Sequence, residues 1–530
     1  MKVLIYLLIS FVVCESFSFK CGHDMFLNRT FGNISIESGL PRTSNLMSNS
    51  AGMRFHVDYT SINKQKLVNN EYIEKLKQGI DDTVGLLSQL LKPTKTIPKF
   101  QFTKEIVQSC DKSLDLSPEL AQGVDADMII FPYVVTQQQI GQGVIAAAGA
   151  CLFLKEYGKL ERPIAGIVFL GSEYDFSKQN SDTYIKEILL HEITHILVFS
   201  PFLFDIYKTQ PVYKSITWHE SQKVILITPK VVEAAKKHFN CSTLQGVEVE
   251  DQGGSGSAGA HWESRIMLGD YMVSTDYDER AISEITMALF EDSGWYTVNK
   301  YTGGLFKFGK NEGCQFLEEK CITNEKATFP REFCDESRKS MCYPGLSTKG
   351  NCYLFTGIKN IPTEYRYWKD STKGGFPPAD YCPVASTMNQ DAARYNIVMN
   401  CKRGKVYEEN ENYGEIIGNN SLCFESSLIK KGMSKEGTKA ICYSVTCDMK
   451  NKLYTIQAGS AKATCDSNTK SVTFEGFDGE VTCASFSLVC TGSEFCNDIF
   501  GCVEVKSTPL AGNHISYSLY LLVLFLIFWV

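Results

Sequence analysis

The sequence is poor in the features that mark several large classes of protein. Its net charge of −7 is spread along 530 residues without a basic block or stripe, and it shows no internal repeat. A chain without a basic surface is not expected to bind nucleic acid, and a chain without a repeat is not expected to form a solenoid or propeller. Long disorder is also not expected, because 44% of the residues are hydrophobic and 12% are aromatic. The sequence therefore indicates a folded protein that is long enough for two or more lobes.

Cysteine, in contrast, is abundant. The chain has 20 cysteines, a number that fits an oxidising compartment. Eighteen of them lie between Cys110 and Cys502, an even number that is consistent with full pairing. Fifteen of these eighteen lie between Cys314 and Cys502, and the other three precede Cys314. Because both counts are odd, at least one bond must join these two regions if all eighteen pair. The dense region after Cys314 is expected to form a separate, disulfide-stapled lobe.

Both ends of the chain resemble sorting signals. Residues 1–18 have a basic start, an apolar run and small residues, which is the pattern of a secretory signal peptide. Residues 507–530 combine small residues, a short polar spacer and an apolar tail, the layout of a GPI-attachment signal. A short tail anchor that stays in place is the alternative. The expected location is the outer cell surface, reached through the secretory pathway, with release from the surface as a further possibility.

Four Asn-x-Ser/Thr sequons add to the secretory pattern, and they are candidate N-glycosylation sites. They begin at Asn28, Asn33, Asn240 and Asn419. Residues 19–50 are polar and follow the signal, so we expect them to be a prosegment.

Predicted strands and helices alternate along the chain that follows. The patterns predict strands at 53–59, 128–135 and 164–170, and helices at 68–92, 144–154 and 181–196. This alternation predicts an α/β catalytic lobe.

The last of these helices contains a metal-binding motif. Residues 191–195 read His-Glu-Ile-Thr-His, and on a helix the two histidines share a face and can bind one metal ion. Glu192 is placed to take a proton from an attacking water, while zinc lowers the pKa of that water and polarises the scissile carbonyl. The alternative, two incidental surface histidines, is unattractive because the chain has only eight histidines and the neighbouring residues are apolar.

His191 and His195 need a third protein ligand. In the compact form of this motif a histidine follows six residues after the second one, but Pro201 occupies that position. Acidic residues apart, the downstream candidates are His219, His238, His261 and His514.

A glycine-rich stretch at 251–260 leads into the pair His261-Trp262, and Met272 follows eleven residues after the histidine. Such a stretch lets the backbone fold closely under a metal site. This arrangement resembles the leishmanolysin family, surface metzincins in which a long insertion separates the second and third zinc histidines. The resemblance implies that His261 is the third zinc ligand and that Met272 forms the Met-turn.

The resemblance covers about residues 21–502 and is most specific at 184–200 and 237–296. It leaves His219 and His238 as ordinary structural or surface histidines. It also implies the fold class, α+β, with a metzincin-like catalytic lobe (a mixed sheet plus the zinc-binding helix), a central α/β lobe and a disulfide-rich C-terminal lobe. The expected boundaries are 1–18 for the signal peptide, 19–50 for the prosegment, 51–200 for the catalytic subdomain, 201–310 for the central subdomain, 311–506 for the Cys-rich domain and 507–530 for the GPI signal.

Three cysteines receive roles from the same resemblance. Cys241 lies where the family has a cysteine bonded past the following helix, which implies pairing with Cys314. Cys21 begins a Cys-Gly-His-Asp sequence that is similar to the family's prosegment motif. Its thiolate could fill the open zinc position until the prosegment is cleaved, and an ordinary disulfide is the alternative.

One residue departs from the family pattern. The family usually has glycine three residues after the second histidine, where this chain has Val198. If that position needs a positive φ, valine is strained there by roughly 1–3 kcal/mol.

The expected function is that of a zinc metalloendopeptidase with one Zn²⁺ per chain, which acts as a monomer on protein or peptide substrates. The metzincin resemblance implies that an extended peptide binds against an edge strand, and residues 162–170 are the candidate for that strand. The alternative, favoured by Val198, is a surface adhesion or binding glycoprotein with weak catalysis. Glu192 favours the enzyme, because a purely structural zinc site does not need this residue.

Overall fold

The computed structural model describes residues 32–35 and 52–490, with gaps at 98, 142, 157, 178–180, 253–256, 276, 278, 300–305, 339, 387–399, 403–409 and 435–436. The predicted features outside the described residues are therefore the signal peptide, most of the prosegment, the GPI signal, Cys21, Asn28 and His514.

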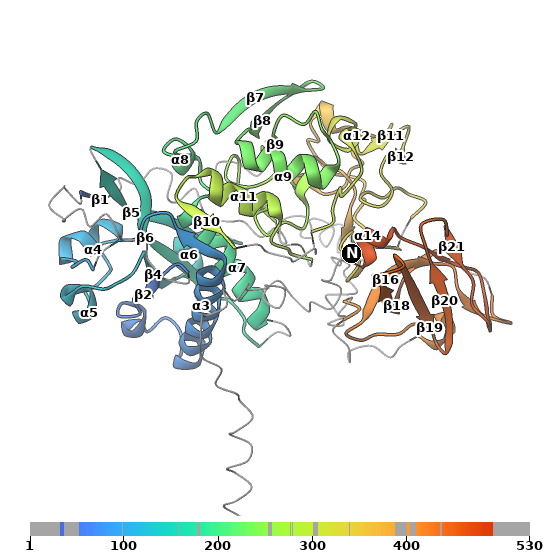
Figure 1. Ribbon diagram of the computed structural model, residues 1–530, viewed down its shortest axis with the longest axis horizontal. Helices are drawn as coiled ribbons and strands as arrows, with labels where there is room; N and C mark the ends of the chain where they lie inside the picture. The colour runs from blue at the N-terminus through green and yellow to red at the C-terminus, as the bar shows by residue number, and fades with distance from the viewer. Residues whose placement is uncertain are drawn as a thin grey trace, which may run out of the picture.

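A five-stranded sheet organises the N-terminal part of the chain, with the order β1-β5-β6-β4-β2. Its strands are β1 (Gly32–Ser35), β2 (Phe55–Val57), β4 (Met128–Val135), β5 (Ala146–Glu156) and β6 (Lys159–Gly171). Strands β2, β4 and β6 are parallel to one another, β5 is antiparallel to β6, and β1 is parallel to β5. The sheet is therefore mixed, and β5 has only the four-residue β1 beyond it (Figure 1).

Helices cover both faces of this sheet. The long helices α3 (Asn70–Leu90) and α7 (Ser181–Leu197) lie together on one face, and α4 (Lys104–Cys110) and α5 (Pro118–Gln122) lie on the other (Figure 1). The approach of α7 to the sheet depends on Gly166 in β6, since a Cβ built there would lie 2.4 Å from a methyl carbon of Ile196. The predicted helices at 68–92 and 181–196 and the predicted strands at 128–135 and 164–170 are confirmed.

The predicted helix at 144–154 is wrong, because these residues form most of β5. Ala146 and Ala148 pack into the core on the α7 side of the sheet, and Ala147 and Cys151 pack into the core on the α4 side. A strand buried on both faces gives a continuous apolar run, which periodicity cannot distinguish from a buried helix. The expected edge strand at 162–170 is also wrong, since β6 lies between β4 and β5.

The middle of the chain forms a second, mixed part. A three-stranded sheet of β7 (Tyr213–Trp218), β8 (Ser221–Leu226) and β9 (Val247–Glu248) accompanies two packed helices, α9 (Pro229–Phe239) and α11 (Glu284–Asp292). The strand β10 (Tyr296–Val298) then pairs with β3 (Leu91–Pro93), so the chain returns to the N-terminal part.

The C-terminal part contains a six-stranded sheet and most of the disulfides. The sheet order is β20-β19-β18-β16-β23-β21. The strands are β16 (Ser421–Ser426), β18 (Lys439–Asp448), β19 (Leu453–Ala458), β20 (Ala461–Cys465), β21 (Ser471–Val472) and β23 (Val481–Thr482). The protein is thus a mixed α and β structure.

All cysteines within the described residues are paired. The bonds are Cys110–Cys151, Cys241–Cys314, Cys321–Cys382, Cys334–Cys352, Cys342–Cys423, Cys401–Cys442, Cys447–Cys490 and Cys465–Cys483. Among them, only Cys241–Cys314 joins the chain before residue 313 to the Cys-rich region, as the odd counts on either side require. Eight disulfides indicate an oxidising, extracellular or secreted environment.

Candidate metal centre

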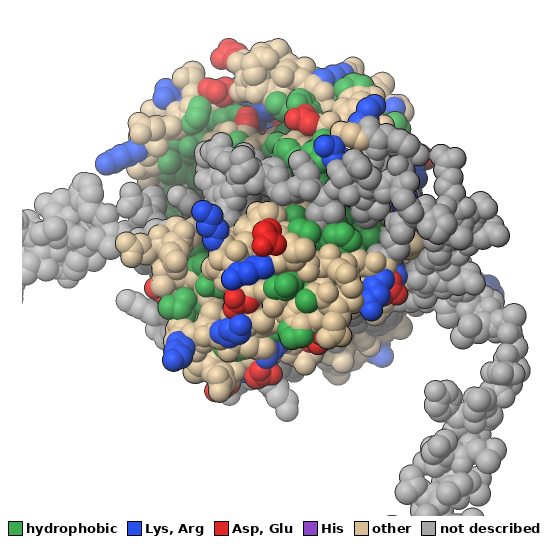
Figure 2. All heavy atoms as spheres, turned by 90° about the vertical axis from the view of Figure 1, so that its left-hand side faces the viewer, with side chains coloured by type: hydrophobic (Ala, Val, Ile, Leu, Met, Phe, Trp, Pro, Cys, Tyr) green, Lys and Arg blue, Asp and Glu red, His purple; other side chains and the backbone are tan. Residues whose placement is uncertain are grey.

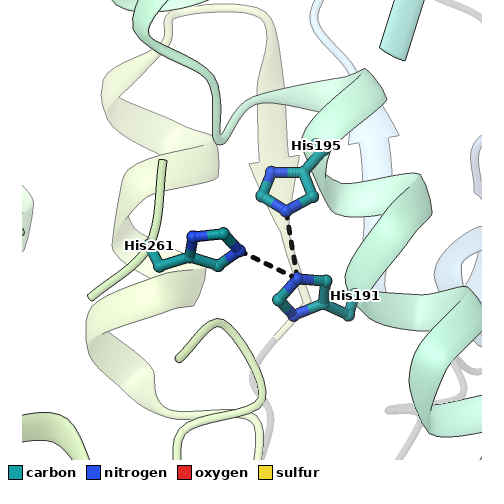
Figure 3. Close-up of side chains that lie close together, drawn as sticks. All are labelled: His191, His195 and His261. Atoms are coloured by element: carbon teal, nitrogen blue, oxygen red, sulfur yellow. Dashed lines mark hydrogen bonds between the residues drawn. The ribbon is translucent and has the colours of Figure 1, made fainter. Parts of the chain in front are cut away.

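Three histidine rings meet beside helix α7. His191 and His195 project from successive turns of the helix, and His261 reaches them from a loop 66 residues further along the chain (Figure 3). The Nε2 atom of His191 lies 3.0 Å from Nε2 of His195 and 3.1 Å from Nε2 of His261. All three side chains are buried. The structure therefore brings together the three residues that the motif and the resemblance selected.

The other nitrogen of each ring faces a backbone carbonyl. The pairs are His191 Nδ1 with Tyr271 O at 2.7 Å, His195 Nδ1 with Phe199 O at 2.7 Å, and His261 Nδ1 with Ser257 O at 2.9 Å. A carbonyl only accepts hydrogen bonds, so each Nδ1 must carry the proton and donate it. Each neutral ring then presents the lone pair of its Nε2 atom to the common centre.

This arrangement fits a metal ion. Three lone pairs at about 3 Å repel one another unless a cation or a proton lies between them. Nitrogen ligands at about 2.0–2.1 Å from a tetrahedral zinc are themselves about 3.3 Å apart, close to the observed spacing. Three imidazoles with their second nitrogens on carbonyls are a typical ligand set for zinc with its supporting hydrogen bonds.

Backbone pairing fixes the loop that carries His261. The amide of Glu250 donates to His261 O at 2.9 Å, and the amide of Glu263 donates to Glu248 O at 3.1 Å. The neighbouring Trp262 is fully buried, and its indole Nε1–H donates to Thr286 Oγ1 at 2.8 Å. His261 therefore lies on a short, strand-like segment that is hydrogen-bonded to both the central sheet and α11.

Met272 lies in a tight turn next to this segment. The amide of Trp262 donates to Met272 O at 3.0 Å, and Met272 is fully buried. Asp270 holds the turn, because its carboxylate accepts hydrogen bonds from the amide of Met272 at 2.8 Å and from the hydroxyl of Thr286 at 2.8 Å. Burial raises the pKa of Asp270 to about 6, and these hydrogen bonds act in the opposite direction.

The turn also supports the first histidine. Tyr271 uses its carbonyl to accept from His191, and its hydroxyl lies 3.0 Å from Thr194 Oγ1 on α7. The hydrogen bonds of Asp270, Tyr271, Phe199 and Ser257 were not predicted from the sequence. Three of these four residues contact the histidines only through a backbone carbonyl. Because every residue has a backbone carbonyl, the amino-acid type at these positions does not predict the contact.

Glu192 is fully buried on α7, one residue after His191. Val198 lies in the turn that follows the helix, and it is not among the residues with positive φ. Its amide donates to Thr194 O at 2.9 Å, its carbonyl accepts from the hydroxyl of Tyr207 at 2.9 Å, and its side chain is fully buried. Valine therefore fits this turn without the strain that a left-handed backbone would impose.

The remaining histidine candidates do not reach the centre. His219 Nε2 contacts Glu318 O at 3.0 Å, and His238 Nε2 contacts Phe308 O at 2.8 Å. Burial lowers the pKa of His238 to about 4. Both are structural contacts, and His514 lies outside the described residues.

Of the sequons, Asn240 and Asn419 are exposed, and Asn33 lies in β1.

Charges of both signs are interspersed on the face shown in Figure 2, where no large patch of one sign is visible. Within the described residues, one stretch, Ser181–Phe204, is long and apolar enough to cross a membrane, but 83% of its most apolar window is buried inside the protein. This stretch contains α7, so burial in the core accounts for its composition.

The comparisons with known proteins agree on one peptidase family. The peptidase family M8, leishmanolysin, matches residues 67–497. Leishmanolysin of Leishmania tropica is 25% identical over 399 residues, which cover 72% of this chain and 56% of the relative. The leishmanolysin-like peptidase of Caenorhabditis elegans is 28% identical over 379 residues, 58% of this chain and 56% of the relative. The chain thus spans about half the length of the curated relatives that it matches.

Proposed function

Because the chain belongs to the leishmanolysin family, we propose that it is a zinc-dependent endopeptidase that hydrolyses peptide bonds in proteins. The observation that carries this proposal is the convergence of three buried Nε2 atoms, each in a ring whose Nδ1 is held by a carbonyl. His191, His195 and His261 would hold one zinc ion per chain. Bound there, zinc would lower the pKa of a water and polarise the scissile carbonyl.

The chain's own residues supply the rest of the chemistry. Glu192 takes the proton of the attacking water on its carboxylate and returns it to the leaving amine. The three carbonyl acceptors hold the imidazoles in the tautomer whose Nε2 lone pair can bind the metal. The turn at Asp270–Met272 keeps His191 in place through the carbonyl of Tyr271.

The outer edge of β5 is the proposed place for an extended substrate. Strand β5 packs against α7, and the ring of Phe153 lies 5.3 Å from that of Phe202, just beyond the C-terminal end of the helix. Backbone groups at a free strand edge pair readily with an extended peptide. In the structure that edge is taken by β1, with Gly32 opposite Leu152 and Ser35 opposite Lys155.

Strand β1 falls within residues 19–50, so the prosegment proposal gains a second element. The prosegment would block the β5 edge with β1 and the open zinc position with the Cys21 thiolate. Cleavage of the full chain before residue 51 should then increase peptidase activity. Ile34→Pro, which removes a backbone N–H from β1, should raise the activity of the uncleaved chain. Equal activity before and after cleavage would contradict this latency.

The cell-surface location remains part of the proposal. Eight disulfides and two exposed sequon asparagines support a secretory route. A phosphatidylinositol-specific phospholipase should release the protein from intact cells if it carries a GPI anchor, whereas a protein anchored by a retained tail should stay on the cells.

The test of the peptidase proposal is cleavage of casein by the prosegment-cleaved protein and by its Glu192→Gln variant, with bound zinc measured in both. Loss of the general base should lower cleavage by about 10²–10⁴-fold, while zinc stays bound. Equal and negligible cleavage by both proteins would favour the alternative, a surface adhesion or binding glycoprotein. That alternative has lost its main support, because Val198 causes no backbone strain.

A further inference from the structure

A second group of metal-binding side chains lies on the same segment as His261. The carboxylates of Glu250, Asp251 and Glu263 each offer an oxygen, and these oxygens all lie within 4.8 Å of one another. Glu250 and Glu263 are almost completely buried, whereas Asp251 is partly exposed. The backbone hydrogen bond from Glu250 to His261 O places this group next to the third zinc ligand.

The group contains more carboxyl groups than its surroundings contain cations. Five carboxylates gather here, those of Glu248, Glu250, Asp251, Glu263 and Asp380, against the two cations Lys223 and Arg265. Lys223 pairs with Asp251 and Asp380, each at 2.9 Å, and Arg265 pairs with Glu248 and Asp380. Glu250 and Glu263 form no ion pair with any residue that the structure describes. The cluster therefore has three more carboxyl groups than cations among the described residues.

One oxygen in the group also lacks a hydrogen bond. Glu263 is fully buried, and its Oε1 atom accepts from the amide of Arg265 at 2.9 Å. Its Oε2 atom is buried and has no hydrogen-bond partner among the described residues. A buried carboxylate oxygen without a partner is costly, because it loses its hydration and gains nothing in return. The Glu263 carboxylate could therefore be satisfied by a cation bound together with Glu250 and Asp251.

We propose that Glu250, Asp251 and Glu263 bind a calcium ion, which holds the loop that carries His261. The donors are all oxygens, which calcium prefers and zinc does not. Calcium–oxygen distances of about 2.3–2.6 Å allow two ligands to stand up to about 5 Å apart across the ion, in agreement with the observed limit of 4.8 Å. Magnesium, with about 2.0–2.1 Å, requires a tighter and more regular cage.

The site has a structural consequence. Residues 251–260 connect the calcium ligands Glu250 and Asp251 to His261, and Glu263 lies two residues beyond that histidine. Calcium would fix the backbone on both sides of the proposed third zinc ligand. This effect is independent of peptidase activity, so the site can be tested on the inactive enzyme.

The test is a calorimetric titration of the full, zinc-loaded chain with Ca²⁺ alone, after calcium has been removed from the buffer. Tb³⁺ serves as a second probe, because the hydroxyl of Tyr365 lies 3.5 Å from Asp251 and its ring could sensitise the emission. We expect one Ca²⁺ per chain, with an affinity in the micromolar to millimolar range. Saturation with Ca²⁺ should raise the Tm by about 5 °C.

Two substitutions at the site and one control complete the design. Glu263→Gln and Asp251→Asn should each weaken Ca²⁺ binding at least tenfold, and the partly exposed Asp251 gives a variant that still folds if Glu263→Gln does not. Glu332→Gln is the matched control, since Glu332 is also buried with an unpartnered Oε2 but stands beside Arg331. It should leave Ca²⁺ affinity unchanged. Absence of Ca²⁺ binding by the wild-type chain, or equal affinity in Asp251→Asn, would overturn the proposal and show that protons neutralise the group.

Discussion

Two clusters of metal-binding side chains meet at the segment 248–263, which contributes His261 to one and Glu248, Glu250, Asp251 and Glu263 to the other, and they are built in different ways. In the histidine cluster, each ring has a carbonyl on its second nitrogen, so the three rings are oriented before any metal arrives. In the carboxylate cluster, carboxyl groups outnumber cations, and the Oε2 atoms of Glu248 and Glu263 are buried without a hydrogen-bond partner among the described residues. The first arrangement offers nitrogen donors to the proposed catalytic zinc, and the second offers oxygen donors to the proposed structural calcium. The two sites are adjacent along the chain but differ in donor atoms, nitrogen in the first and oxygen in the second.

Removal of all metals should produce the largest difference between the clusters. A chelator that strips the prosegment-cleaved protein should abolish casein cleavage, because the three imidazoles then hold no zinc. One equivalent of Zn²⁺ should restore cleavage, whereas Ca²⁺ alone should not. Full recovery with Ca²⁺ alone would mean that the two clusters are not distinct in the way their donors indicate.

Val198→Gly tests whether the turn below the histidine cluster prefers glycine. The side chain is fully buried and the backbone does not need a positive φ. The substitution removes apolar packing and adds backbone freedom to the unfolded chain, so it should lower the free energy of unfolding by about 2–3 kcal/mol. Denaturant unfolding measures the loss. An increase in stability, or a gain in casein cleavage, would show that valine strains the turn.

Asp270→Asn tests how far the histidine cluster depends on its supports. An amide nitrogen cannot accept the hydrogen bonds that the carboxylate takes from Thr286 and Ser283, which leaves buried groups without a good partner. The free energy of unfolding should fall by about 1–3 kcal/mol at pH 7. Zinc affinity should fall by about 10–100-fold, because the carbonyl of Tyr271 then holds His191 less firmly. Ca²⁺ binding should persist in this variant. Loss of Ca²⁺ binding together with zinc affinity would show that the two clusters depend on each other.

His238 provides the smallest effect and a reference outside both clusters. Its pKa is lowered to about 4, below the value of about 6.5 in an unfolded chain. The contribution of neutral His238 is therefore present above about pH 6.5 and is lost as the pH falls toward 4. His238→Gln should flatten this part of the stability profile by about 2 kcal/mol, less than a fully buried ring would give. An unchanged slope would show that other groups cause the acid sensitivity.

The sequence predicts the histidine cluster far better than the carboxylate cluster. The HExxH pair is local, since His191 and His195 lie one turn apart on a strongly apolar helix. His261 required the family resemblance, because nothing in its spacing from the helix excluded His219 or His238. The carboxylate cluster brings together residues far apart in sequence, such as Lys223 and Asp380, which are 157 positions apart. No local sequence pattern predicts such a contact.

The fold shows the same division between local and distant information. Periodicity predicts the helix around Leu76, which buries one side, and the helix around Ile188, in which every residue from Ile188 to Leu197 is buried. It fails at β5, where Ala147 and Ala148 pack into the hydrophobic cores on opposite faces of the sheet. Both faces of the strand are therefore apolar, and the sequence shows no alternation of apolar and polar residues. The order of strands, and therefore the strand that lies at the edge, depends on pairings between distant segments that the sequence does not display.

The most direct test of the central claim is the zinc content of the purified chain, compared with that of His261→Ala and His219→Ala. We expect one zinc per chain in the wild type and in His219→Ala, and little or none in His261→Ala. The His219 ring contacts only the carbonyl of Glu318, at 3.0 Å, among the described hydrogen bonds. Full zinc retention by His261→Ala, or its loss in His219→Ala, would contradict the proposal that His261 completes the metal centre.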